Sequence, residues 1–177
     1  MIRRFLPLTA LAPFVAVATT LIPHTDAQRA LASDRVAVVE VIERRTVSDP
    51  ADARRLKTHT QLQVRENVRG TGPSSVTLVQ LGGTVGQQSM LIPGDAAFAV
   101  GERALVFLSC PSPDRCYLVA LGEGKIPIVD RETVVVHDMV TDEYARRPLR
   151  ELIAELRAVL SPKAKCPGSA VVPEGGR

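Results

Sequence analysis

The most constraining feature of the chain is the stretch at residues 98–128, whose pattern indicates a β-hairpin with a cysteine at each end of its loop. Two short runs, ALVFLS at 104–109 and YLVAL at 117–121, are rich in Val, Leu and aromatic residues, which favours buried strands. The residues between Cys110 and Cys116 include two prolines and an aspartate, which favour a loop. Opposed Cβ atoms at such strand ends lie within disulfide range, so we predict a bridge.

The predicted bridge closes a short loop, so it would contribute only about 2 kcal/mol and would clip the hairpin rather than hold the fold together. The alternative is two free thiols in a reducing compartment. Cys166, in the Pro- and Gly-rich tail, is the third cysteine of the chain and is left over. It either links two chains or stays free.

The N-terminus has the order of a secretory signal peptide. Two arginines precede an apolar segment at residues 5–22, and a polar stretch ending in Ala27 follows. We therefore expect cleavage after residues 1–27, a mature chain from Gln28, and export to the periplasm or the extracellular space. The alternative is an uncleaved membrane anchor, because the apolar segment is long enough to span a bilayer. The sequence does not separate the Sec route from twin-arginine export.

Removal of the signal would leave 150 of the 177 residues, enough for one domain with a core. The signal carries two arginines and one aspartate, so the net charge falls from +3 to +2. The chain has no Trp, two Tyr and four Phe. A nucleic-acid binder needs a dense basic face or stacking aromatics, so we expect no nucleic-acid partner.

The first half of the mature chain indicates strands separated by polar segments. Residues 36–42, VAVVEVI, form a Val-rich run that suits a barrel strand with Ala37, Val39 and Val41 on one face. The polar segment at 43–57 is predicted to be a solvated loop. Residues 59–68 alternate, so that one face is apolar and the other is exposed to water, which favours an antiparallel sheet or barrel.

Later segments add short strands and one helix. Strand candidates lie at 75–81, 90–92 and 133–136, and Pro127 restricts a further run to an edge strand or a bulge. Apolar residues recur at helical spacing after Pro148, which suits the first helical position. The predicted fold is therefore all-β: a small antiparallel barrel with a C-terminal amphipathic helix that caps one end of it.

The predicted organisation has five parts along the chain. They are a signal peptide (1–27), an N-terminal extension (28–34), a β-barrel domain (35–140), a C-terminal helix with its lead-in (141–161), and a disordered tail (162–177).

The order of the motifs VVEVI, ENVRG, Phe-x-Val-Gly-Glu before LVFL, and Tyr-Leu-Val-x-x-Gly-x-Gly-Lys resembles small exported bacterial β-domains of an uncharacterised kind. More distantly it is similar to netrin-like modules, which implies an oligonucleotide/oligosaccharide-binding (OB) type barrel. The resemblance covers residues 36–129 and concerns structural glycines and strand residues. The protease inhibitors among those modules use an N-terminal cysteine, whereas the predicted terminus here is Gln28.

Motifs for catalysis, metal ligation or phosphate binding are absent from the sequence: it has no HExxH, CxxC, GxSxG or glycine-rich phosphate loop. We therefore predict no catalytic residue, no metal ligand and no cofactor. His137 and Asp138 are adjacent, and neighbours on a strand face opposite ways, so they are poorly placed to act together. Glu66 is predicted at a strand end, and Glu102, Glu123 and Lys125 form a candidate polar cluster.

The remaining candidate is a basic interaction surface on the 43–57 segment and the polar face that follows it. Its residues are Arg44, Arg45, Arg54, Arg55, Lys57, His59 and Arg65.

The function expected from the sequence is that of an exported, non-enzymatic module that binds an envelope or extracellular protein or glycan. A membrane contact is expected only through an uncleaved signal, and the oligomeric state stays open. The alternatives are a small secreted hydrolase or its accessory subunit, and a netrin-like protease inhibitor.

Overall fold

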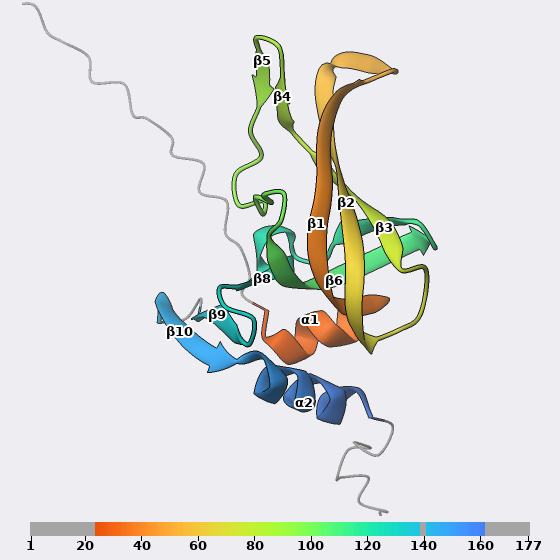
Figure 1. The fold of residues 1–177 in the computed structure, drawn as a ribbon. Coiled ribbons are helices and arrows are strands. Elements are labelled where there is room, and N and C mark those ends of the chain that lie inside the picture. The colour runs from red at the N-terminus through yellow and green to blue at the C-terminus, as the bar shows by residue number, and fades with distance from the viewer. Residues whose placement is uncertain (1–23, 139–140, 162–177) are drawn as a thin grey trace, which may run out of the picture.

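The structure is a computed structural model that describes residues 24–138 and 141–161. Five of its strands close into a barrel (Figure 1). They are β1 (Arg35–Asp49), β2 (Asp52–Arg69), β3 (Ser75–Leu81), β6 (Arg103–Ser112) and β7 (Arg115–Leu118). Neighbouring strands pair antiparallel, except β3 and β7, which run parallel where they complete the barrel. This closed arrangement is compatible with an OB-like barrel, and the predicted fold class is confirmed.

Alternate residues of β1 point into two separate cores. Ala37, Val39 and Val41 face the barrel interior, whereas Val36 and Val38 face outward, and all five are buried. Because a strand's side chains alternate between its two faces, a strand buried on both sides has a continuous apolar run. β6 pairs with β1 over six residues and alternates in the same way. This double burial explains the runs VAVVEVI and ALVFLS, and the predicted barrel face of β1 is confirmed.

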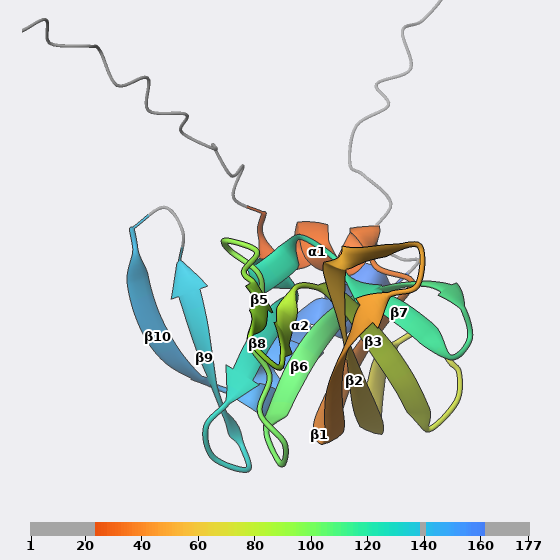
Figure 2. The same ribbon diagram turned by 90° about the horizontal axis from the view of Figure 1, so that it is seen from above.

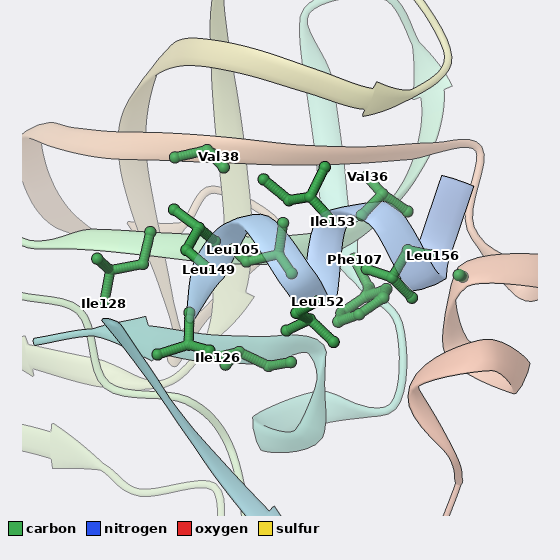
Figure 3. Packing of buried hydrophobic residues seen from close by; sticks show 12 residues of the cluster. Val36, Val38, Leu105, Phe107, Ile126, Ile128, Leu149, Leu152, Ile153 and Leu156 are labelled. Atoms are coloured by element: carbon green, nitrogen blue, oxygen red, sulfur yellow. The ribbon is translucent and has the colours of Figure 1, made fainter. Parts of the chain in front are cut away.

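The C-terminal helix α2 (Leu149–Leu160) packs against the outer wall of the barrel. Its buried residues are Leu149, Leu152, Ile153 and Leu156. They contact the outward-facing side chains of β1, β6 and β8 (Lys125–Ile128), as Figure 3 shows. The predicted amphipathic helix is confirmed, but it covers a wall of the barrel rather than one end. Pro148 is the N-cap and has extended backbone angles, so it is not the first helical residue.

Beyond β6 the sheet continues outside the barrel through β8, β9 (Thr133–Asp138) and β10 (Glu143–Pro148). Figure 2 shows β9 and β10 at the outer edge of the molecule. A separate hairpin, β4 (Gly83–Val85) with β5 (Gln88–Met90), lies beside the far end of β1 and β2 (Figure 1).

A short N-terminal helix, α1 (Asp26–Ala32), was not predicted from the sequence. Thr25 and Gln28 form a reciprocal capping box, in which Thr25 N–H donates to Gln28 Oε1 at 2.9 Å and Gln28 N–H to Thr25 Oγ1 at 3.2 Å. Ala30 is fully buried in the core beneath α2. The Arg29 guanidinium lies 5.3 Å from the Phe107 ring centroid. The expected cleavage point after Ala27 therefore falls inside the first turn of a packed helix.

Three predicted segments differ from the structure. Residues 43–57 are not a loop: β1 runs to Asp49 and β2 starts at Asp52, so both strands extend beyond the barrel as a polar ribbon. The second hairpin strand stops at Leu118, because the chain takes positive φ angles at Ala120 and Leu121 and enters a 3-10 helix, η1 (Leu121–Gly124). The predicted strand at 90–92 is instead β5. The predicted signal sequence up to residue 23, the tail at 162–177 and Cys166 lie outside the described residues.

The packing of α2 leads to a first prediction. Leu152 is 1 % exposed beneath the helix, so Leu152→Ala should lower the free energy of unfolding by about 3 kcal/mol through lost burial and a residual cavity. Val159 lies on the same helix and is 37 % exposed, so Val159→Ala should change it by less than about 0.5 kcal/mol. Urea denaturation followed by circular dichroism measures both. Equal effects for the two substitutions would contradict this packing.

The cap of α1 leads to a second prediction. A protein that begins at Gln28 lacks Thr25 and Asp26, and its new α-amino charge sits at a helix N-terminus, where a cation is unfavourable. We expect it to be less stable by about 1–2 kcal/mol than one that begins at His24. Thr25→Ala in the longer protein isolates the cap and should account for about 1 kcal/mol. Identical thermal melting of all three proteins would show that α1 contributes no stability.

Candidate functional site

The outer wall of the barrel carries a groove at the point where the polar ribbon leaves it. We call this the wall groove, and its volume is about 610 Å³. It is lined by Val47, Ser48, Pro50, Lys57, His59, Val79, Gln80, Leu81, Arg115 and Tyr117. Four strands of the barrel, β1, β2, β3 and β7, contribute to it.

Strand register places the groove side chains on one face of the sheet. His59 of β2 lies opposite Arg45 of β1 and opposite Val79 of β3. On β7, Arg115 lies beside Thr77 of β3. Directly paired residues share a face, so these side chains form one continuous outer surface. The alternate residues of the same strands, such as Leu62 and Leu78, fill the barrel interior.

The groove combines an apolar floor with cationic groups. Val47 and Val79 are half-buried, whereas Leu81 and Tyr117 remain 52 % and 42 % exposed. Lys57 is held by Asp49, with Nζ 2.7 Å from Oδ2.

Two other cations around the groove, Arg45 and Arg115, have no carboxylate partner in the described part of the chain. His59 likewise has no side-chain partner in that part of the chain. Glu43 is the nearby carboxylate on the same face of β1. The surface is therefore basic overall and can attract an anionic group to an apolar floor.

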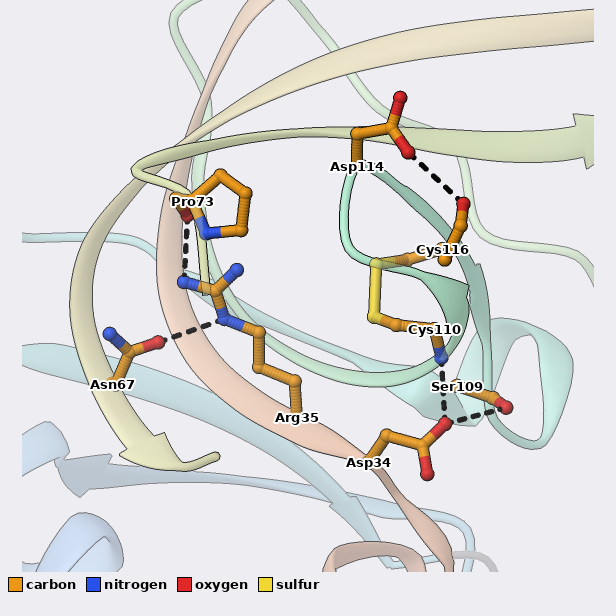
Figure 4. The surroundings of a disulfide bond; sticks show 9 residues. Asp34, Arg35, Asn67, Pro73, Ser109, Cys110, Asp114 and Cys116 are labelled. Carbon is orange, nitrogen blue, oxygen red and sulfur yellow. Dashed lines mark hydrogen bonds between the residues drawn. A yellow bond between two sulfur atoms is a disulfide. The ribbon is translucent and has the colours of Figure 1, made fainter. Parts of the chain in front are cut away.

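The predicted disulfide joins β7, which lines the wall groove, to β6. Cys110 and Cys116 are bonded, with their Cα atoms 4.1 Å apart (Figure 4). Asp34 accepts hydrogen bonds at Oδ2 from the Cys110 N–H at 2.8 Å and the Ser109 hydroxyl at 3.1 Å. β7 has only two register pairs with β3, so the bond helps to hold Arg115 and its neighbours against the barrel.

A buried arginine supports the barrel beside the disulfide. Arg35 is 3 % exposed, and its Nε donates to Asn67 Oδ1 while its Nη2 donates to the Pro73 carbonyl, each at 2.9 Å (Figure 4). Burial lowers the pKa of the Arg35 guanidinium. These bonds tie the turn after β2 to the start of β1.

The structure brings together only part of the predicted basic surface. Lys57 and His59 line the wall groove, and Arg45 lies next to them. Arg44 lies on the opposite face of the ribbon, where it lines a separate hollow of about 230 Å³ beside β4 and β5. The other three lie elsewhere: Arg54 and Arg55 near the ribbon tip, the latter 3.6 Å from Asp52, and Arg65 in an ion pair with Glu40 at 2.8 Å.

Sequence reasoning missed Arg115 and Tyr117 as groove residues. The parallel pairing of β7 with β3, which carries them to this wall, leaves no local pattern in the sequence. One signal was present in the sequence: a cysteine is usually buried, so Arg115 and Tyr117, on either side of Cys116 in a strand, would point outward.

A second hollow, of about 430 Å³, lies between β8, β9, β10 and η1. There His137 Nε2 lies 2.8 Å from Asp142 Oδ1, and its ring stacks on Tyr144 with the centroids 4.3 Å apart. His137 therefore has Asp142 as a partner. Among the described residues that line this hollow, none is a Ser, Thr or Cys that could act as a nucleophile.

The candidate carboxylates separate into different ion pairs. Lys125 pairs with Glu102 and lies over the Phe98 ring, whereas Glu123 lies 3.5 Å from Arg29. Glu66 accepts from Arg157 of α2 at 2.8 Å. The described part of the chain contains no group of three or more His, Cys, Asp or Glu that could hold a metal ion.

In comparisons with known proteins, no family model matches the chain, and no curated protein matches its sequence. Among the described residues, none of the helices has the length and apolar character needed to cross a membrane.

The ion pair at the groove predicts a pH dependence. The hydrogen bond from Lys57, and then the one from Ala51 N–H, lower the pKa of Asp49 below its ordinary value of 3.8. A carboxyl whose pKa is lowered by folding stabilises the protein above its unfolded pKa and loses this effect as the pH falls through the folded pKa. Asp49→Asn should therefore lower the urea midpoint at pH 7, and the difference should fade below about pH 4. Glu43→Gln is the control, and an Asp49→Asn deficit that persists unchanged at about pH 2 would contradict the assignment.

Proposed function

We propose that this protein is an exported, non-enzymatic binding module that holds an acidic chain of another envelope or extracellular component in its wall groove. One observation carries the proposal: cationic side chains without carboxylate partners in the described residues surround an apolar floor on the barrel wall. Electrostatic attraction of this kind speeds association and selects anionic partners. The exposed Tyr117 and Leu81 add contact area.

Further features support the proposed export of the protein and its proposed relationship to netrin-like modules. The apolar N-terminal segment and the Cys110–Cys116 bond both suit a protein that is exported to an oxidising compartment. The OB-like barrel with a helix after it supports a distant netrin-like relationship. An inhibitor's N-terminal cysteine has no counterpart between residues 24 and 109. We therefore place binding in the groove and not at the N-terminus.

The test is a cross-linking pull-down from the envelope fraction and culture fluid of the producing cells, with protein that begins at His24 and carries Cys166→Ser. We expect an enriched partner whose affinity for the purified bait falls at least tenfold with Arg115→Glu or Tyr117→Ala, equivalent to about 1.4 kcal/mol. Arg131→Glu makes the same charge change in the turn before β9, away from the groove, and should bind normally.

The binding affinities separate the proposal from its rivals. A partner that binds Arg115→Glu and the unchanged protein equally would place the interface elsewhere. A hydrolytic activity that disappears with His137→Ala while the protein stays folded would instead favour the enzyme reading. Stoichiometric inhibition of an extracellular protease would favour the inhibitor reading.

A further inference from the structure

The last strand of the sheet, β10, has one free edge. It pairs with β9 over six consecutive residues without a bulge, and among the described residues no other strand pairs with it. Figure 2 places β10 at the margin of the molecule. Five of its six residues are exposed. An edge of this kind presents unpaired backbone N–H and C=O groups to which another strand can add.

The two faces of β10 carry different groups. Arg147 forms an ion pair with Glu155 of α2, so Glu143, Ala145 and Arg147 share the face on the side of α2. Tyr144 stacks on His137, so Tyr144 and Arg146 share the opposite face. Within the described residues Glu143 and Arg146 have no ion-pair partner, and Tyr144 is 71 % exposed.

A second copy of the same edge fits these residues. Two β10 strands related by a twofold axis perpendicular to the sheet run antiparallel, and each residue then pairs with one from the same face. With the axis at Ala145, Glu143 of each copy lies opposite Arg147 of the other, on the α2 side. Tyr144 of each copy then lies opposite Arg146 of the other, where the guanidinium can stack on the ring.

We infer that the protein self-associates through β10 into a twofold-symmetric dimer whose two sheets join edge to edge in the register centred on Ala145. Opposite charges in directly opposed pairs stabilise a sheet, and like charges destabilise it. A register centred on Arg146 instead places the two Arg146 guanidinium groups against each other. Charged side chains on an edge strand commonly prevent it from pairing with another strand. On β10 the charges of Glu143 and Arg147 instead attract each other across the dimer in the register centred on Ala145.

This interface contains none of the wall-groove residues, so the inference is independent of the proposed function. Six residues from each copy bury less surface than the about 800 Å² per partner of a standard interface. We therefore expect a weak dimer, with a dissociation constant on the order of 10–100 µM.

Sedimentation equilibrium over a range of protein concentrations tests the inference, with Cys166→Ser throughout to exclude a link through that cysteine. Glu143→Arg opposes Arg to Arg in the dimer, and Arg147→Glu opposes Glu to Glu. Each variant alone should be at least tenfold weaker in self-association. An equimolar mixture of the two should recover a heterodimer, because each altered residue then faces the opposite charge.

Two matched variants separate the edge from its surroundings. Glu155→Gln removes the partner of Arg147 within the same chain, and Glu151→Arg makes the Glu143→Arg charge change on the exposed side of α2. Both should dimerise normally. Thermal melting of every variant confirms folding, and the mixing experiment stays informative even if one substitution lowers stability.

Cysteine cross-linking tests the register. Ala145 faces its own counterpart across the axis, so Ala145→Cys should give a disulfide-linked dimer when copper–phenanthroline takes up the two electrons of the thiol pair. Arg146→Cys faces Tyr144 and should cross-link far less. A protein that stays monomeric at several hundred micromolar overturns the inference. So does a dimer unaffected by both charge reversals, or one cross-linked better through residue 146.

Discussion

The antiparallel pairing of β1 with β6 is the interaction on which the rest of the structure depends. Both strands are buried on both of their faces. On each strand, one face points into the barrel interior and the opposite face packs against α2. Each strand therefore contributes side chains to both hydrophobic cores, at about 0.8 kcal/mol for each buried CH₂ group. Loss of this pair would open the barrel and remove the surface on which both helices rest.

The wall groove depends on how the barrel closes on its other side. β3 and β7 share only two register pairs, and Thr77 N–H donates to the Asp114 carbonyl at 2.7 Å beside them. The Cys110–Cys116 bond and the Asp34 carboxylate hold the same hairpin from its opposite flank. The position of Arg115 thus rests on a short parallel pairing reinforced by a covalent clip.

The sequence predicted those parts of the fold whose cause is local. The double-sided burial of β1 appears as a Val-rich run, the hairpin clip as two cysteines around a Pro-rich loop, and α2 as an apolar stripe of helical period. It failed where the cause is not local. The 43–57 segment forms strands because its backbone groups pair across the ribbon, with Thr46 and Thr58 hydroxyls 2.9 Å apart, and not because apolar residues alternate. The helix α1 did have a local signal, the Thr25–Gln28 capping box, but that pair spans the predicted boundary between the signal peptide and the mature chain.

The two candidate surfaces, the polar ribbon and β10, lie on strands that are held by backbone pairing more than by the packing of apolar side chains. Within the single strand β1, the residues change from buried to exposed after Val41, so packing constrains the first half and leaves the second half free to carry charge. β10 is likewise mostly exposed, and its residues contribute little to either core. Segments held in strand form by backbone pairing alone can vary in side chain at little cost to stability. The charges of the ribbon and of β10 are therefore the features of this chain most open to selection for partners, whereas those of Arg29 and Arg35 are committed to the fold.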